Sequence, residues 1–158
     1  MKITVFSDTH GHTDGMLRAI RAAKPDAVFH LGDYERDIRC VREAFPALLL
    51  CSVSGNCDSR PENPDTAVFT VGGVRIFTSH GHRYGVKYAL DALLNAGYFS
   101  NAGLILFGHT HVAMHEELEG THILNPGSAG MGARCTYGLV TIEDSQVVSC
   151  AVLPVPVS

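Results

Sequence analysis

The sequence lacks a membrane-length apolar run, a C-x-x-C pair and any excess of basic residues. Its first apolar run, residues 3–6, is interrupted by Ser7 and Asp8 and is too short for a signal peptide or a membrane span. We therefore expect a cytoplasmic protein without a membrane partner. The five cysteines are odd in number and form no C-x-x-C pair, which argues against a disulfide framework and a zinc knuckle and favours reduced thiols.

Basic residues do not outnumber acidic ones: 12 Lys and Arg stand against 16 Asp and Glu, and the formal net charge is −4. The chain therefore offers no positive field for a nucleic-acid backbone, and nucleic acid is not expected as its main partner. Repeats and low-complexity tracts are also absent, and hydrophobic residues make up 46%, which excludes a disordered or fibrous chain. The length predicts one domain over residues 1–158, whose self-association the sequence leaves open.

The first half of the sequence alternates between short apolar runs, typical of strands, and helical spacing. The expected strands are residues 2–6, 27–31 and 47–53. One helix is expected to begin at Thr13 or Asp14 and to end at Pro25, and a second to span residues 36–45. This alternation predicts strand, loop and helix units.

In the second half, Gly72 and Gly73 separate two strand patterns, residues 67–71 and 74–78, as in a hairpin with a primed turn. A helix is expected over residues 86–96, with Gly97 ending it. Further strands are expected over residues 104–107, 112–118, 122–124, 137–142 and 146–152. The whole pattern indicates an α/β fold in which two sheets pack face to face with helices outside.

Nine histidines stand out in the composition, and six of them form three His-x-His pairs. Residue types that bind metals also follow five apolar runs within a few residues, at the strand ends where α/β proteins carry their sites. Side chains two residues apart near a strand end can project to the same side, so these residues can converge on an ion. The expected metal ligands are Asp8, His10, Asp33, Asn56, His80, His109 and His111.

These seven groups are too many for one ion. Sharing one bridging carboxylate, they would hold two cations roughly 3.5–4 Å apart, an arrangement that suits phosphoryl displacement. Carboxylates, imidazoles and one amide suit Mn²⁺, Fe²⁺, Zn²⁺, Co²⁺ or Ni²⁺ rather than a structural zinc. His12, His30, His115 and His122 lack this support. His30 is expected as a hydrogen-bonded core residue, and His115 and His122 on strand faces turned to solvent or to a partner.

Five motifs in this order resemble those of the calcineurin-like metallophosphoesterases: Asp8-x-His10, Gly32-Asp33, Gly55-Asn56-x-Asp58, His80-Gly81-His82 and Gly108-His109-x-His111. The short length, the Gly-Asn-Cys-Asp form of the third motif and the segment Asn125-Pro126-Gly127-Ser128 are most similar to the small YfcE-type phosphodiesterase subgroup. The resemblance implies a four-layer αββα sandwich of the metallo-dependent phosphatase type, with two mixed sheets flanked by helices. It also implies that Asp8, His10 and His111 bind one metal, that Asn56, His80 and His109 bind the other, and that Asp33 bridges them.

The activity we expect is hydrolysis of a small phosphodiester or phosphomonoester by a hydroxide that bridges two divalent cations, with Asp33, Asn56 and His109 as catalytic residues. Mn²⁺ is the favoured cofactor, with Ni²⁺, Zn²⁺, Fe²⁺, Co²⁺ and Mg²⁺ as alternatives. The motifs favour a phosphodiesterase but do not separate it from a phosphomonoesterase or a narrowly specific nucleotide phosphohydrolase. A binding scaffold on this fold is a further alternative, although every ligand position is filled.

Cys57 is a departure from the family pattern. Larger members carry at this place a histidine that contacts the phosphate or the leaving group. A neutral thiol is a poorer proton donor than an imidazolium, so good leaving groups are favoured unless His12, His82 or water replaces it. The alternative is that Cys57 is an inert thiol without a catalytic role. Asp58 is expected to orient a ligand histidine rather than to bind metal.

Three loops are candidate substrate contacts. The alternative is that they are surface loops without a role in substrate binding. The loops are residues 59–65, 82–84 and 129–134, and Arg134 is the expected phosphate-binding cation.

Overall fold

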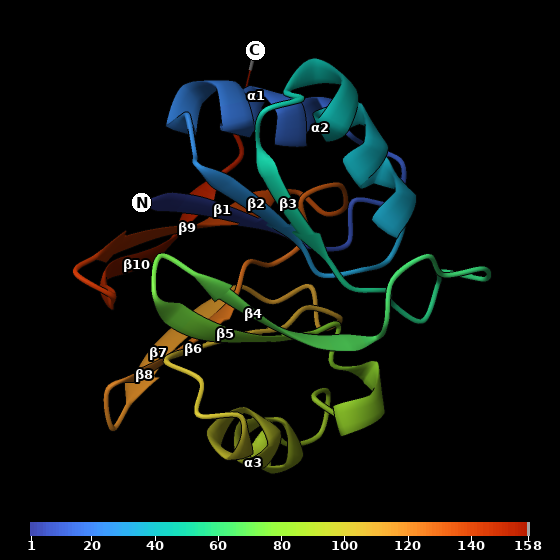
Figure 1. Cartoon of the computed structure of the whole chain (residues 1–158). Helices are drawn as coiled ribbons and strands as arrows, with labels where there is room; N and C mark the ends of the chain where they lie inside the picture. Colours follow the sequence, from blue (N-terminus) through green and yellow to red (C-terminus); the bar gives the residue numbers. More distant parts are fainter. Residues whose placement is uncertain (158) are drawn as a thin grey trace.

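Two five-stranded mixed sheets pack face to face, and helices cover their outer faces (Figure 1). This computed structural model describes residues 1–157. The strand orders are β10-β9-β1-β2-β3 in the first sheet and β4-β5-β6-β8-β7 in the second. The layering confirms the expected αββα sandwich.

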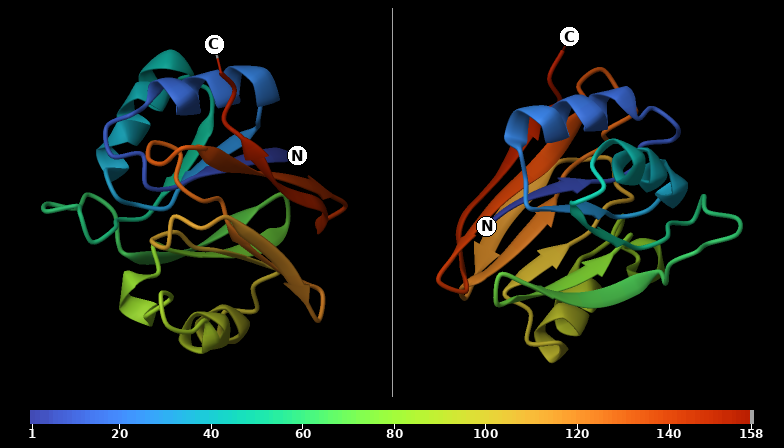
Figure 2. Two further views of the ribbon diagram at one scale, coloured as in Figure 1. Left: turned by 180° about the vertical axis from the view of Figure 1, so that it is seen from behind. Right: turned by 45° about the horizontal axis from the view of Figure 1, so that its top comes forward.

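The first sheet has a parallel centre and an antiparallel edge. β1 pairs in parallel with β2, and β2 pairs in parallel with β3, whereas β9 runs antiparallel to both β1 and β10. Helices α1 and α2 lie on its outer face (Figures 1 and 2). The elements are β1 (Lys2–Phe6), α1 (Asp14–Ala23), β2 (Ala27–His30), a 3₁₀ turn (Glu35–Asp37), α2 (Ile38–Ala44), β3 (Leu49–Ser52), β9 (Thr136–Glu143) and β10 (Gln146–Pro154).

The second sheet is covered by a single helix, α3. β4 and β5 form an antiparallel hairpin, β5, β6 and β8 run in parallel, and β7 closes the sheet antiparallel to β8. Within residues 1–157, no helix is long and apolar enough to cross a membrane. The elements are β4 (Thr66–Val71), β5 (Val74–Ser79), a 3₁₀ turn (His82–Tyr84), α3 (Asp91–Phe99), β6 (Leu104–Leu106), β7 (Met114–Leu118) and β8 (Thr121–Asn125).

The largest apolar cluster lies between the two sheets. In β2, Ala27 and Phe29 pack into this cluster, whereas Val28 packs into a second cluster beneath α1 and α2. Because side chains alternate along a strand, β2 is buried on both faces, which explains its uninterrupted apolar run. A third cluster lies between α3 and the second sheet.

Two glycine predictions had different outcomes. Gly72 and Gly73 have φ angles of 59° and 80°, so the expected primed turn between β4 and β5 is confirmed. The expected helix over residues 86–96 exists with different bounds, because α3 spans Asp91–Phe99 and continues through Gly97. A Cβ atom on Gly97 would lie 2.3 Å from Ile105 Cδ1, so this glycine allows close packing of α3 on β6 rather than ending the helix.

Several element boundaries also differ from expectation. The run at residues 47–53 forms a strand only over Leu49–Ser52, and β7 begins at Met114 rather than at residue 112. The second helical pattern begins with a 3₁₀ turn at Glu35 before α2 starts. Each parallel strand nevertheless ends where a polar loop begins, and the loop of residues 53–65 extends away from both sheets (Figure 2).

His30 is fully buried and hydrogen-bonded, as expected. Its Nδ1 accepts the Gly32 N–H at 3.3 Å, and its Nε2 lies 3.0 Å from Thr9 Oγ1. A neutral ring with its proton on Nε2 satisfies both partners, whereas protonation of Nδ1 would place two donors face to face. Burial accordingly lowers the pKa of His30 from 6.5 to about 4.

This shift predicts a pH-dependent stability for the metal-free protein. Below pH 6.5 the unfolded chain binds a proton that folded His30 rejects, so acidification favours unfolding. The free energy of unfolding should fall by roughly 3 kcal/mol between pH 6.5 and pH 4 from this residue alone, since one pKa unit corresponds to about 1.4 kcal/mol. Urea unfolding with a chelator present, across this range, should show a shallower dependence for His30→Gln. Parallel curves for the two proteins would contradict the prediction.

Candidate metal centre

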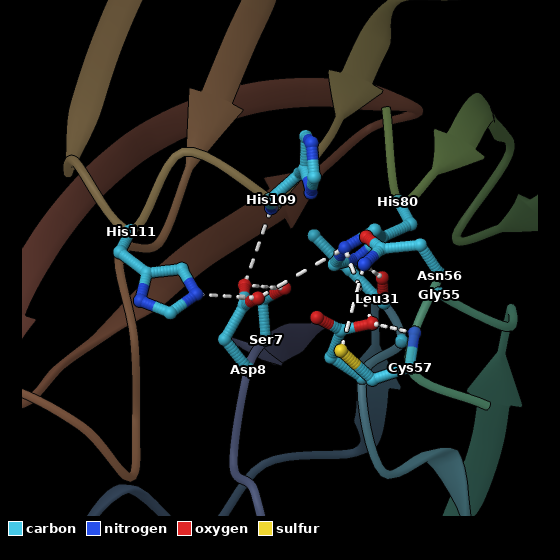
Figure 3. Close-up of polar contacts among 12 residues, drawn as sticks. Ser7, Asp8, Leu31, Gly55, Asn56, Cys57, His80, His109 and His111 are labelled. Carbon is cyan, nitrogen blue, oxygen red and sulfur yellow. Dashed lines mark hydrogen bonds and ion pairs between the residues drawn. The ribbon is translucent and has the colours of Figure 1, made fainter. Parts of the chain in front are cut away.

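The Asp8 carboxylate lies at the centre of a group of histidines (Figure 3). It follows β1 and is fully buried. Three imidazole nitrogens surround its Oδ1. They are His111 Nε2 at 3.0 Å, from the loop after β6, His80 Nε2 at 3.9 Å, from the loop after β5, and His10 Nε2 at 4.0 Å, from the same loop as Asp8. The other oxygen, Oδ2, accepts hydrogen bonds from Ser7 Oγ and from the His109 N–H. Only Oδ1 is therefore directed at the imidazoles.

Asp33 follows β2 and directs its two carboxylate oxygens at different histidines. Oδ1 lies 3.4 Å from His80 Nε2, and Oδ2 lies 3.8 Å from His10 Nε2. The Cys57 N–H donates to Oδ1 at 2.9 Å, which fixes the carboxylate from the loop after β3. A side chain placed in this way can serve two ions at once.

Buried polar atoms without hydrogen-bond partners gather at this place. Among residues 1–157 there are six such side-chain atoms, and four are here: Asp8 Oδ1, His10 Nε2, His80 Nε2 and His82 Nδ1. Such atoms are costly in a folded protein unless another group satisfies them. His80 Nδ1 donates to the Leu31 carbonyl at 2.8 Å, which leaves the Nε2 lone pair free for a ligand. Carboxylate oxygens and imidazole nitrogens are suitable donors for divalent cations, so the residues fit a metal centre.

Asp8 belongs to two overlapping groups of candidate ligand atoms, and a third group joins His10, Asp33 and Cys57. The ligand atoms of Asp8, His10 and His111 lie within 4.8 Å of one another, and so do those of Asp8, Asp33 and His80. Each group has the size of a coordination sphere. The two groups share Asp8, and Asp33 faces histidines of both.

The backbone is unusual at the same residues. Non-glycine residues rarely adopt positive φ angles, and they persist where the surrounding structure holds them. Five candidate ligands have such angles: Asp8 (55°), His10 (47°), Asp33 (55°), His109 (67°) and His111 (58°). For Asp8 the restraint is visible, because its N–H donates to the Gly32 carbonyl and its own carbonyl accepts the Ser128 hydroxyl. These contacts hold the backbone of Asp8 in this conformation.

Asp58 has a different role from the one expected. The sequence suggested that it orients a ligand histidine, but that role at His80 belongs to the Leu31 carbonyl. Its carboxylate instead accepts backbone N–H groups from Asp33, Tyr34, Glu35 and Gly55. Asp58 thus holds the loop that carries Asp33 against the loop that carries Asn56.

Asn56 and His109 lie at the side of the centre marked by His80. Figure 3 places the Asn56 side chain beside that of His80, and the ring centroids of His80 and His109 are 5.0 Å apart. Asn56 is exposed, and its Nδ2 lies 3.5 Å from Cys57 Sγ. Within residues 1–157, His109 is in none of the closely spaced ligand groups.

The surroundings of Asp33 and His109 favour the forms of these two side chains that bind metal. Burial opposes ionisation of Asp33, but the His80 ring 3.4 Å away outweighs burial and holds the pKa of Asp33 well below its usual range. Burial and the nearby charge of His80 lower the pKa of His109 to about 4, so this ring is neutral at pH 7. For His80, burial favours the neutral ring, whereas Asp33 and Asp8 raise its pKa above the ordinary value. A cation bound between these residues would replace that proton.

The remaining candidate residues do not all lie at the centre. Cys57 Sγ lies within 4.8 Å of ligand atoms of His10 and Asp33, and burial together with nearby carboxylates raises the pKa of its thiol to about 11. The His82 ring centroid is 5.5 Å from that of His80, and burial lowers its pKa. His12 and Arg134 line a surface cavity of about 590 Å³ beside the loop that carries His10.

Two contributors to the centre and one residue of the neighbouring cavity were not expected from the sequence. Ser7 donates to Asp8, the Leu31 carbonyl orients His80, and Arg18 lines the same cavity as Arg134. The polar interruption of the first apolar run was a signal for Ser7. A backbone carbonyl leaves no side-chain signal at all, so Leu31 could not have been found in this way.

The chain is similar to known proteins over most of its length. Residues 1–145 match the model of the calcineurin-like phosphoesterase superfamily domain. The probable metallophosphoesterase YsnB of Bacillus subtilis is 34% identical over 153 residues, covering 91% of this chain and 86% of that protein. Phosphodiesterase YfcE of Escherichia coli K12 is 28% identical over 182 residues, covering 97% and 92%. The crystal structure of a predicted phosphoesterase from Streptococcus pneumoniae TIGR4 superposes with a TM-score of 0.78 at 31% identity, covering 97% of this chain and 88% of that one.

Proposed function

Because the chain belongs to the calcineurin-like phosphoesterase superfamily, we propose that it is a phosphodiesterase that hydrolyses small phosphodiesters with two divalent cations. Relatives named metallophosphoesterase and phosphodiesterase support a metal-dependent hydrolase. The observation that carries the dinuclear proposal is the Asp33 carboxylate, whose two oxygens face His80 and His10 separately.

The proposed ligand sets are those that the family resemblance implies, and the two groups that share Asp8 support part of them. Asp8, His10 and His111 hold one cation, His80 holds the other with Asn56 and His109, and Asp33 is shared. We favour Mn²⁺ because carboxylate and amide oxygens form part of the donor set, and Zn²⁺, Ni²⁺, Fe²⁺, Co²⁺ and Mg²⁺ are the alternatives to be compared. Two cations bound here would lower the pKa of a water molecule and neutralise charge on a phosphoryl group.

The chain's own residues supply binding and orientation. The cavity next to His10 presents His12, Arg18 and Arg134, which suits an anionic or polar substituent of the ester. Cys57, whose pKa is raised to about 11, stays a neutral thiol and is a weak proton donor to a leaving alkoxide. This combination favours small esters with good leaving groups.

Removal of metal provides the direct test of this proposal. Metal-stripped protein should be inactive on bis(p-nitrophenyl) phosphate and p-nitrophenyl phosphate, and added Mn²⁺ should restore turnover, faster for the diester. Ni²⁺, Zn²⁺ and Mg²⁺ are compared at equal concentration, with bound metal measured in each sample. Faster hydrolysis of the monoester would identify a phosphomonoesterase instead. Bound metal without turnover of either ester would overturn the proposed activity on simple esters.

A further inference from the structure

A second group of metal-binding side chains lies outside the centre described above, at the open edge between the two sheets. It consists of His115 on β7, His122 on β8 and Cys150 on β10. One ligand atom from each lies within 4.8 Å of the others. β7 and β10 are edge strands of different sheets, and β10 contacts both β7 and β8 (Figure 1). The group therefore spans the sandwich.

Strand register explains why the three side chains converge. His115 pairs with Leu124, and Glu117 pairs with His122 across β7 and β8. Because side chains alternate along a strand, both histidines share the face of Leu124, which packs into the inter-sheet cluster. Cys150 is half-buried, packs against the same cluster from the other sheet and is a free thiol. Imidazoles from one sheet thus meet a thiol from the other.

The geometry of the histidine pair suits a shared ion. His115 Nε2 lies 3.1 Å from His122 Nδ1, and the two rings stack within 10° of parallel. Two nitrogens on one tetrahedral Zn²⁺ ion, each at 2.0–2.1 Å, lie about 3.3 Å apart. The other nitrogen of His122, Nε2, lies 3.9 Å from Glu117 Oε2. A carboxylate behind a histidine commonly fixes the orientation of a metal ligand.

We propose that His115, His122 and Cys150 bind one Zn²⁺ ion that joins the edge strands of the two sheets. Two imidazoles and a thiolate are a donor set typical of zinc, whereas the first centre offers oxygen and nitrogen donors that also suit harder ions. Binding displaces the thiol proton of Cys150 to solvent and leaves a fourth position to water. The ion links β10 to the β7–β8 hairpin. The proposal does not depend on the activity proposed for the other centre.

Cobalt spectroscopy separates the two centres. Co²⁺ bound to a thiolate gives a sulfur-to-metal charge-transfer band in the near ultraviolet, which ligands with only oxygen and nitrogen donors do not give. The wild-type protein loaded with Co²⁺ should show this band, and Cys150→Ser should lose it. Cys57→Ser is the matched control, because Cys57 lies beside the first centre, and it should retain the band.

Equilibrium dialysis with Zn²⁺ alone gives an independent measure of the number of zinc ions bound per chain. Cys150→Ser and His115→Gln should each bind one equivalent per chain less than the wild type, and both should keep wild-type diester hydrolysis. His115 is exposed, so His115→Gln tests the site even if Cys150→Ser fails to fold. Equal zinc content in all three proteins, or a charge-transfer band lost in Cys57→Ser instead, would show that the two imidazoles form only a hydrogen-bonded pair and would overturn the proposal.

Discussion

Replacing Asp33 with Asn is expected to reduce metal-dependent turnover on the order of 10³-fold, with little effect on folding. The amide keeps one oxygen, which can still accept the Cys57 N–H, so the loop after β3 stays in place. It loses the negative charge and presents an NH₂ group to one of the two histidines that the carboxylate now faces. Both proposed cations then lose a charged ligand, and removal of a single electrostatic group from an active site already costs about 10²–10³ in turnover.

Asp26→Asn provides the matched control for this experiment. Asp26 also accepts a backbone N–H, from Lys2, but it is exposed and lies at the opposite end of the first sheet. Turnover of bis(p-nitrophenyl) phosphate and bound Mn²⁺ per chain are measured for both variants. Near wild-type turnover in Asp33→Asn would exclude the shared-carboxylate assignment, and an equal loss in Asp26→Asn would indicate a general effect on stability.

Much of the fold could be predicted because its strands are buried in ways that leave strong patterns. β2 is apolar throughout since both of its faces pack against neighbours, and polar residues follow at once where the strand ends. Asp8, Asp33 and His80 each follow the end of a strand, which indicated that their side chains could converge. Gly97 shows the limit of such patterns, because a glycine that ends a helix and one that packs closely against Ile105 look alike in the sequence.

The supporting contacts of the site could not be predicted from side-chain types. Asp58 stabilises the Asp33 loop through four backbone N–H groups, and such contacts depend on how two loops approach each other in space. The group of His115, His122 and Cys150 depends on strand register and on the packing of one sheet edge against the other. The sequence placed both histidines on strand faces, and His115 is exposed, but nothing in it indicated that a cysteine 28 residues beyond His122 lies beside them.

Gly55→Ala is expected to disable the metal centre through packing alone. A Cβ atom at this position would lie 2.2 Å from Asp33 Oδ1 and 2.4 Å from the Asp33 backbone nitrogen. Neither atom can move easily, because Asp58 accepts the N–H groups of both Asp33 and Gly55 and fixes the two loops together. Overpacking of this kind costs about 1–3 kcal/mol of stability. Displacement of Asp33 should lower metal affinity roughly 10–100-fold, as loss of a supporting contact does at other metal sites.

Gly103→Ala separates this local effect from the general effect of adding a methyl group. A Cβ on Gly103 would meet only Val74 Cγ1 at 3.4 Å, an ordinary contact, and the bond from its N–H to the Arg75 carbonyl is unaffected. When turnover is titrated with Mn²⁺, Gly55→Ala should need a higher Mn²⁺ concentration for half-maximal turnover than Gly103→Ala. Gly103→Ala should match the wild type. Because Gly55→Ala leaves every proposed ligand in the sequence, restoration of turnover at high Mn²⁺ would locate the defect in metal binding. Wild-type metal affinity in Gly55→Ala would instead mean that the close approach of the two loops does not control the position of Asp33.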